Sequence, residues 1–186
     1  MLTFQNNSHD PFYNQAFEEY VFLNYPDDDV FYLWQNRPAV VVGSYQNICR
    51  EVHVAALRRQ GIPVVRRMSG GGTVYHDLGN VNYTYITRTD GPVDYDRSLT
   101  LVIGALNAIG VPARKNRTCD IAIAEGKISG SAQRSAKGRV LHHARCCSTP
   151  TCRCWTKSPP AGKTTASSPR APSPPSAPSP ISAPIW

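Results

Sequence analysis

The stretch RRMSGGGTVYHDLGNVNY, residues 66–83, joins two arginines to three consecutive glycines and then to a run of aromatic and β-branched residues. The segments IPVVRR before the glycines and TVYHD and VNYTYIT after them are typical of strands. Glycine tolerates positive φ and close approach to its backbone, so residues 69–72 are able to present bare N–H groups to a phosphate. Arg66 and Arg67 would suit its oxygens, because a guanidinium binds them bidentately. The alternative, a long hairpin turn and nothing more, stays open.

A second loop of small residues follows a lysine in the stretch GKISGSAQR, where Lys127 precedes Ser129, Gly130, Ser131 and Ala132. A lone lysine after a turn is usually a solvated charge. Two glycine–serine loops, each with a cation beside it, are more informative. Lys127 would then place its ammonium on a carboxylate or phosphoryl oxygen held by the first loop, where charge develops.

The remaining pattern predicts an α+β domain with a mixed or antiparallel sheet. Helical spacing of apolar residues indicates helices over about residues 11–25, over EVHVAALRRQ, and over YDRSLTLVIGALNAIG, which ends at Gly110. The segments VFYLW and AVVVG are two short β-rich runs separated by QNRP, and DIAIAEGKISGSA is predicted to be a hairpin that turns at Glu125 and Gly126. RVLHH begins another strand. The simplest arrangement is one sheet with a few packed helices.

The composition changes abruptly after His143. All 13 acidic residues precede Ala144, whereas residues 144–186 hold 10 of the 16 prolines and four of the six cysteines. The net charge of +7 therefore belongs mostly to the tail, and the body of the protein is thiol-poor. No apolar run reaches the length of a membrane span, which is about 18 residues, and the start does not have the pattern of a signal peptide. A cytoplasmic protein that binds neither membrane nor nucleic acid is the default expectation.

These motifs, in this order and spacing, resemble the lipoate-protein ligase A family, whose catalytic domain has the biotin/lipoate protein ligase fold. The resemblance rests on RRMSGGGTVYHDLGNVN, on KISGSA and on His142-His143, and it extends to NQAFEEYVF, LWQNRPAVVVGSYQN and NRTCDIAI. It covers residues 10–143. NRTCD departs from the tighter RND that is usual in the family, which affects the nucleotide side of the site.

The resemblance implies a two-step ligase: lipoate and ATP give lipoyl-adenylate and pyrophosphate, with Mg²⁺, and the lipoyl group then passes to a lysine. The acceptors it implies are lipoyl domains of 2-oxoacid dehydrogenase E2 subunits or glycine cleavage H protein. Lys127 would be the catalytic residue. ATP and lipoyl-adenylate binding would fall to Arg67, Ser69, Gly70, Gly71, Gly72, Thr73, Val74, Tyr75, Asp120 and Lys127. Lipoate binding would fall to Gly43, Arg67, His76 and Lys127.

Several alternatives stay open. Asp120 is either a metal contact or a carboxylate at the edge of a hairpin, so the metal ligands are unknown. His76, His142 and His143 are interpreted as structural hydrogen-bonding groups rather than acid–base catalysts. An octanoyl or lipoyl acyltransferase of the same fold needs an activated cysteine, and neither Cys49 nor Cys119 has a recognisable nucleophile setting in the sequence. A non-catalytic lipoate-binding module is the third possibility.

The tail has two interpretations. Its composition permits a disordered Pro/Ser/Ala linker. However, the family usually continues after the histidines with a strand resembling GTLLFDADL, and regrouping the codons of residues 144–152 by one base is able to restore that strand. We therefore expect a frameshift after His143, with residues 1–143 as a partial catalytic domain and 144–186 as an out-of-frame tail. On this view the chain is truncated, lacks the strand after His143 and is not expected to be a competent enzyme; the nucleotide sequence around codon 143 tests it.

Overall fold

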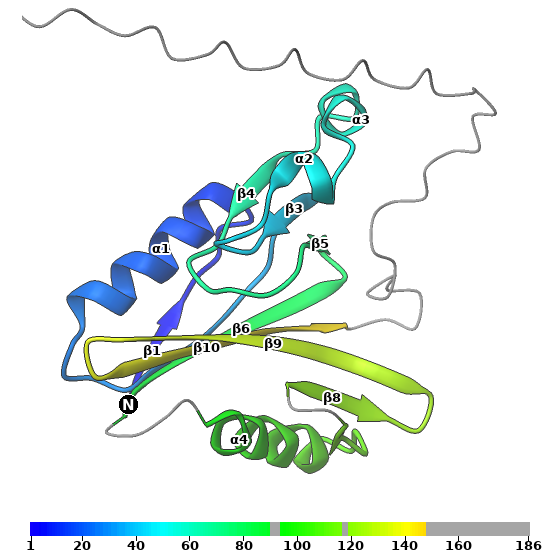
Figure 1. Cartoon of the computed structure of the whole chain (residues 1–186). Helices are drawn as coiled ribbons and strands as arrows, with labels where there is room; N and C mark the ends of the chain where they lie inside the picture. Colours follow the sequence, from blue (N-terminus) through cyan, green and yellow to red (C-terminus); the bar gives the residue numbers. More distant parts are fainter. Residues whose placement is uncertain (90–93, 117–118, 148–186) are drawn as a thin grey trace, which may run out of the picture.

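The computed structural model describes residues 1–89, 94–116 and 119–147 (Figure 1). This part of the chain forms a seven-stranded sheet, a three-stranded sheet and four helices. The predicted α+β class is confirmed. The second sheet was not anticipated, and the site lies between the two.

The large sheet is mixed and has the strand order β1-β2-β6-β10-β9-β8-β7. Its strands are β1 Leu2–Gln5, β2 Val30–Trp34, β6 Asn80–Arg88, β7 Arg114–Lys115, β8 Asp120–Ile123, β9 Gly126–Ala136 and β10 Arg139–Cys147. Only the β1–β2 pair within this sheet is parallel. The predicted hairpin that turns at Glu125 and Gly126 is the β8–β9 pair, and a register shift between Ile121 and Ala122 interrupts its ladder.

The small sheet has the order β4-β3-β5 and consists of β3 Ala39–Val42, β4 Val64–Arg66 and β5 Val74–His76. Strand β3 is parallel to β4 and antiparallel to β5. The glycine-rich segment therefore does not form a hairpin turn, because β4 and β5 both pair with β3 and not with each other. The two β-rich runs around QNRP are also not a hairpin, since β2 and β3 belong to different sheets.

The helices begin at residues that cap them. Asp10 accepts hydrogen bonds from the N–H groups of Phe12 and Tyr13 at the start of α1, Pro11–Asn24, and Asp94 caps α4, Tyr95–Ala108, in the same way. The single helix expected over EVHVAALRRQ is instead two short ones, α2 Ile48–Glu51 and α3 Val54–Arg59. His53 separates them, because its ring nitrogen accepts the N–H of Ala56 and so starts a new helix.

The helices α1 and α4 cover opposite faces of the large sheet (Figure 1). Val21 and Phe22 of α1 pack in one core cluster with Leu141 of β10. Successive side chains of a strand point to opposite faces, and the next residue, His142, contacts Tyr95 of α4. His143 and Arg145 consequently lie on the α1 side, which is also the side of the small sheet.

Strand β10 continues past the point where we expected the sheet to end. It pairs with β6 through Cys147 and with β9 through Cys146, so each residue after His143 up to that point has a partner strand. Ala144 is buried between Tyr83 and Ser131. The prediction that the strand is lost directly after His143 is therefore wrong for residues 144–147, because two neighbouring strands complete their hydrogen bonding. The expected out-of-frame tail from residue 148 onward lies outside the described residues.

Among the described helices, none is long and apolar enough to cross a membrane. Cytoplasmic location stays a prediction.

His142 provides a pH-dependent test of the core. Its ring is fully buried, 3.0 Å from the Tyr83 hydroxyl and 2.7 Å from Gln133 Nε2. Burial is the main cause that lowers the pKa of His142 to about 3, with a smaller electrostatic effect from the neighbouring His143 ring. The unfolded chain then binds this proton more readily than the folded protein, so the contribution to stability is complete above about pH 6.5 and falls as the pH drops towards 3.

We expect the free energy of unfolding to fall by roughly 2–3 kcal/mol between pH 6.5 and 4.5 from this residue, at about 1.4 kcal/mol per pH unit. Urea unfolding at several pH values measures the slope. In His142→Gln the slope of the free energy of unfolding against pH should fall by about 1.4 kcal/mol per pH unit, which corresponds to one proton. An unchanged slope in that variant would show that His142 is not the group that titrates.

Candidate active site

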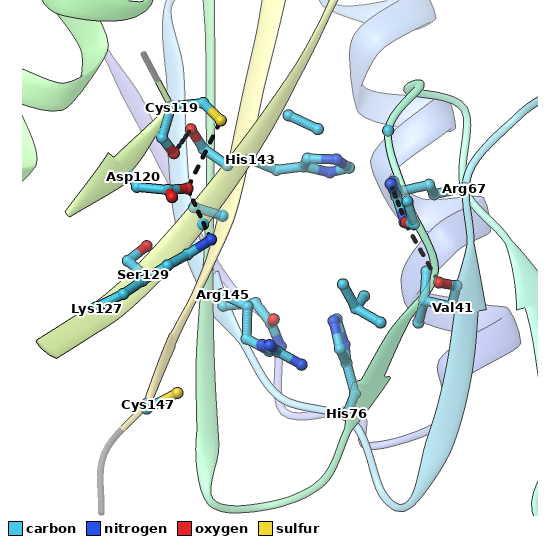
Figure 2. Close-up of a pocket in the computed structure, with 18 of the residues that line it drawn as sticks. Val41, Arg67, His76, Cys119, Asp120, Lys127, Ser129, His143, Arg145 and Cys147 are labelled. Carbon is cyan, nitrogen blue, oxygen red and sulfur yellow. Dashed lines mark hydrogen bonds and ion pairs between the residues drawn. The ribbon is translucent and has the colours of Figure 1, made fainter. Parts of the chain in front are cut away.

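A pocket of about 240 Å³ lies between the small sheet and strands β8, β9 and β10. Figure 2 shows Arg67 and Val41 on one wall and Cys119, Asp120, Lys127 and Ser129 on the opposite wall. His143 and Arg145 project between them from β10, and His76 lies at one end of the view (Figure 2). The two motifs that are far apart in the sequence therefore face one another across one cavity.

Arg67 is held rigidly by the glycine-rich loop. Its Nη2 donates to the carbonyls of Gly70 and Gly72, both at 2.7 Å, and its Nε donates to Gly70 O and to Ser69 Oγ, both at 3.1 Å. Only 7% of the residue is exposed. Burial lowers the pKa of Arg67 to about 10, although the Glu18 carboxylate opposes the shift, so the side chain remains charged near neutral pH.

Arg66 points elsewhere. Its Nη1 donates to the carbonyls of Gly43, Ser44 and Gln46, and the residue is exposed. The two neighbouring arginines therefore do not form the guanidinium pair that the sequence suggested. Arg66 fixes the loop after β3, and Arg67 alone reaches the pocket.

Gly43 lets the glycine-rich loop lie directly against strand β3. A Cβ on Gly43 would lie 2.1 Å from the carbonyl oxygen of Gly71, and Gly71 itself has φ +90°. Neither position accommodates an ordinary side chain without moving backbone. The bare chain at these two glycines thus sets the distance between the loop and the floor of the pocket.

We expect Gly43→Ala to displace this loop and to lower the free energy of unfolding by about 1–3 kcal/mol, the usual cost of overpacking. The matched control is Gly104→Ala on the exposed side of α4, where a new Cβ meets nothing within 4 Å. That change should be neutral or stabilise by roughly 0.5–1 kcal/mol, since alanine favours a helix. Urea unfolding compares the two, and equal stability in both variants would contradict the close contact.

The opposite wall holds an ion pair between Lys127 and Asp120, with Nζ and Oδ1 2.7 Å apart. Asp120 is buried, and 32% of the Lys127 side chain is exposed. Gly130 makes room for the lysine, because a Cβ there would lie 2.9 Å from Nζ and 3.0 Å from Cε. The second small-residue loop, residues 129–132, therefore has no side chain at Gly130, where the Lys127 side chain packs against it.

Cys119 also lines the pocket, with its Sγ 3.6 Å from Asp120 Oδ1. The sequence had not placed it beside the lysine motif. Burial raises the pKa of the Cys119 thiol, and the neighbouring Asp120 raises it further, more than Lys127 lowers it. The thiol is thus close to the site but is not activated as a thiolate.

The predicted site residues divide into two groups. Those that line the pocket are Arg67, Gly71, Gly72, Val74, His76, Asp120 and Lys127. Those that lie around it without lining it are Gly43, Ser69, Gly70, Thr73 and Tyr75. Thr73 Oγ1 lies 3.2 Å from Gln46, and the Tyr75 carbonyl accepts a hydrogen bond from Arg145. His76 is buried beside Asn36, and burial holds its pKa well below the usual range, so it is neutral.

Three polar residues at the pocket were not predicted from the sequence: Arg145, Asn82 and Gln15. Arg145 was assigned to the tail, yet it brings a third cation to the pocket beside Arg67 and Lys127. Asn82 Oδ1 and both amide atoms of Gln15 are buried at the pocket with no hydrogen-bond partner in the described chain, which suits groups that meet a ligand. The asparagine stood within residues 66–83, and Gln15 stood within NQAFEEYVF, a segment that supported the family resemblance but from which no site residue was chosen.

Asp120 is the one carboxylate among the described residues that line the pocket. The described residues contain no group of three or more acidic, histidine or cysteine side chains arranged to hold a metal. This donor set fits an ion such as Mg²⁺ only if substrate phosphates and water supply most of its oxygen ligands, as is usual for that ion.

The lipoyl protein ligase A/B catalytic domain family matches residues 10–153 of the chain. Lipoate–protein ligase 1 of Staphylococcus aureus (strain Mu50 / ATCC 700699) is 40% identical over 141 residues, which are 74% of this chain and 43% of that protein. Lipoate-protein ligase LplJ of Bacillus subtilis (strain 168) is 40% identical over 147 residues, which are 77% of this chain and 44% of that protein. The chain thus spans less than half the length of these curated relatives.

Three solved structures share the fold. The crystal structure of P. falciparum LipL1 in complex with lipoate has a TM-score of 0.69 at 28% identity and covers 76% of this chain and 46% of that one. Lipoate-protein ligase A bound with ATP has a TM-score of 0.64 at 29% identity, with 72% and 60% covered. A bi-partite lipoate protein ligase with its E2 lipoyl domain, from Thermoplasma acidophilum, has a TM-score of 0.67 at 28% identity, with 79% and 59% covered.

Proposed function

Because the chain belongs to the lipoyl protein ligase A/B catalytic domain family, we propose that it is the catalytic part of an ATP-dependent lipoate-protein ligase. The observation that carries this proposal is the pocket in which Arg67 and the glycine-rich loop face Lys127 and Asp120. Three cations and one carboxylate line that pocket within the described residues. Such an excess of positive charge suits a reaction between two anions, a carboxylate and a triphosphate.

In the first step, a carboxylate oxygen of lipoate attacks the α-phosphorus of ATP, and the bond from that phosphorus to the leaving pyrophosphate breaks. The products are lipoyl-adenylate and pyrophosphate. Lys127 moves from Asp120 to the oxygens between the acyl and phosphoryl groups and stabilises their developing charge. Arg67 holds the glycine-rich loop in place, so little reorganisation is needed during the reaction.

In the second step, the amine of an acceptor lysine attacks the acyl carbonyl, forms an amide and releases AMP. The acceptors in this proposal are lipoyl domains of E2 subunits or glycine cleavage H protein, and the reaction takes place in the cytoplasm. A structure with an E2 lipoyl domain exists for the archaeal relative. Mg²⁺ bound to ATP, with Asp120 as its protein ligand, would neutralise charge on the leaving pyrophosphate.

The test is lipoate-dependent exchange of labelled pyrophosphate into ATP by the chain, followed by transfer of the lipoyl group to an isolated lipoyl domain, detected by mass spectrometry. Exchange should need lipoate and ATP together. Exchange that does not depend on lipoate would contradict the proposal. Lipoate binding without exchange would favour the non-catalytic binding module.

Acyl transfer through Cys119 is the second candidate, because the thiol lines the pocket beside Asp120 and Lys127. The burial of the Cys119 thiol and its neighbour Asp120 argue against this candidate, because both raise the pKa of the thiol. An octanoyl thioester donor without ATP separates the two functions. A transferase would modify the lipoyl domain under these conditions and would lose that activity in Cys119→Ser, whereas the ligase would do neither.

A further inference from the structure

A buried carboxylate lies behind the pocket and belongs to none of the predicted site residues. Glu18 of α1 is fully buried, and both of its oxygens lie 2.9 Å from His143 Nδ1. Thr84 Oγ1 donates to it at 2.6 Å. A charge this deep in a protein is costly unless it is paired and hydrogen-bonded, so its partners identify its role.

The hydrogen bonds of Glu18 continue to the pocket. His143 Nε2 lies 2.6 Å from Ser69 Oγ, and Ser69 Oγ accepts a hydrogen bond from Arg67 Nε at 3.1 Å. Four side chains from α1, β10 and the glycine-rich loop therefore form one chain of contacts, with all four members less than 10% exposed. A negative charge stands at one end and a positive charge at the other.

The chemistry of the two ends fixes the direction of every hydrogen bond. A guanidinium only donates, and a carboxylate only accepts. Ser69 Oγ accepts from Arg67, and its own hydrogen needs an acceptor, because only 1% of the residue is exposed. The acceptor within reach is His143 Nε2, so the imidazole carries its hydrogen on Nδ1 and donates it to Glu18.

The serine, histidine and glutamate have the spacing of a hydrolytic triad, but Ser69 is not placed for attack. It is buried, it does not line the pocket, and Arg67 donates to the oxygen that would have to act as nucleophile. The direction of the hydrogen bonds instead leads from Glu18 to the arginine.

We propose that Glu18 is a positioning residue that acts through His143 and Ser69 to fix Arg67 and, with it, the glycine-rich loop. The effect on catalysis rests on the ligase function proposed above; the effect on Arg67 does not. Arg67 holds the carbonyls of Gly70 and Gly72, so a guanidinium that loses its Nε partner loosens the loop that lines the pocket. The nearby carboxylate also raises the pKa of Arg67 and so partly offsets the effect of burial.

The first test is the tautomer of His143, read from its ring ¹⁵N chemical shifts at pH 7.5 in the uniformly labelled chain. We expect the neutral Nδ1–H form. In Glu18→Gln, the side-chain amide should donate to Nδ1, and the ring should change to the Nε2–H form. The neutral Nε2–H form or an imidazolium in the unmodified protein would overturn the proposal.

The second test is hydrogen exchange at Arg67 Nε–H, which needs no activity. Glu18→Gln should accelerate it by tenfold or more, because the Nε2–H tautomer makes Ser69 Oγ accept a competing donor. The matched control is Glu19→Gln, the exposed neighbour on the same helix, which should leave both the tautomer and the exchange rate unchanged. Unchanged exchange in Glu18→Gln, or equal acceleration in Glu19→Gln, would show that Glu18 is not positioning the arginine.

The third test links the network to catalysis. Glu18→Gln and Ser69→Ala should each reduce lipoate-dependent pyrophosphate exchange by about tenfold, and the double variant should be no slower than the slower single one, since both break one chain of contacts. If the fold loss of exchange in the double variant equalled the product of the two single losses, Glu18 would not act through Ser69. If the unmodified chain shows no exchange, the ligase proposal fails in this chain, while the tautomer and Arg67 measurements still decide the role of Glu18.

Discussion

Lys127→Ala should reduce lipoate-dependent pyrophosphate exchange by at least about 10²-fold, which corresponds to roughly 3 kcal/mol of transition-state stabilisation. Lys127 is the cation opposite Arg67 in the pocket, and its ammonium forms an ion pair with Asp120. A substrate anion is able to replace that carboxylate. Charge that develops between the acyl and phosphoryl oxygens would then lack its closest donor. Exchange kinetics at saturating ATP and lipoate measure the effect on turnover.

The matched control is Lys137→Ala, an exposed lysine in the turn between β9 and β10. It changes the net charge by the same amount and should leave the exchange rate unchanged. Thermal unfolding of both variants shows whether the fold is retained, because Asp120 is buried and loses its partner in Lys127→Ala. Near-normal turnover in a folded Lys127→Ala variant would mean that this lysine is a surface charge and nothing more.

Local signals in the sequence were sufficient for the elements whose hydrogen bonds are local. The apolar spacing predicted α1 and α4 to within a few residues, and the turn at Glu125 and Gly126 predicted the β8–β9 hairpin. These elements complete most of their backbone hydrogen bonds with near neighbours. Their boundaries therefore depend little on the rest of the fold.

The division into two sheets depended on distant partners and could not be predicted in this way. Strand β3 pairs with β4 and β5 on either side, and all four of its residues are buried. Its continuous apolar run is typical of a strand covered on both faces, which is a signal that the sequence did contain. Strand β1 had no such signal, because it is a mostly exposed edge strand that pairs in parallel with β2.

The site residues also divide into those that a local sequence pattern predicted and those that only the tertiary fold brings to the pocket. The glycine and lysine motifs identified both walls of the pocket because their unusual composition is local. Glu18 resembled any acidic residue of an amphipathic helix, and only the tertiary fold places it against His143, 125 residues away in the chain. Arg145 was discounted because its segment looked foreign to the domain, yet the ladder of β10 carries it into the pocket.

Arg67→Met should lower the free energy of unfolding by about 3–5 kcal/mol, the usual result of removing one partner from a buried charged network. The carbonyls of Gly70 and Gly72 would lose their donor, and the fully buried Glu18 would lose the positive charge at the other end of its network. Arg67→Lys should recover little of this loss, because an ammonium cannot reproduce the planar fork that spans the two carbonyls. Urea unfolding gives both values.

Arg66→Met is the control that shows whether the loss of stability in Arg67→Met comes from the burial of the arginine or from the number of hydrogen bonds that it donates. Arg66 donates to three carbonyls, but it is exposed, and water is able to replace it there. Its loss should therefore cost about 1 kcal/mol or less, the net value of an ordinary hydrogen bond. If Arg66→Met and Arg67→Met were equally destabilising, the cost would come from the loss of carbonyl donors alone, and the buried link between Arg67 and Glu18 would not contribute to stability. If only Arg67→Met lowers the free energy of unfolding strongly, the residue that shapes the pocket also holds α1, β10 and the glycine-rich loop together. Ligand binding should then weaken in parallel with stability in any variant of this network.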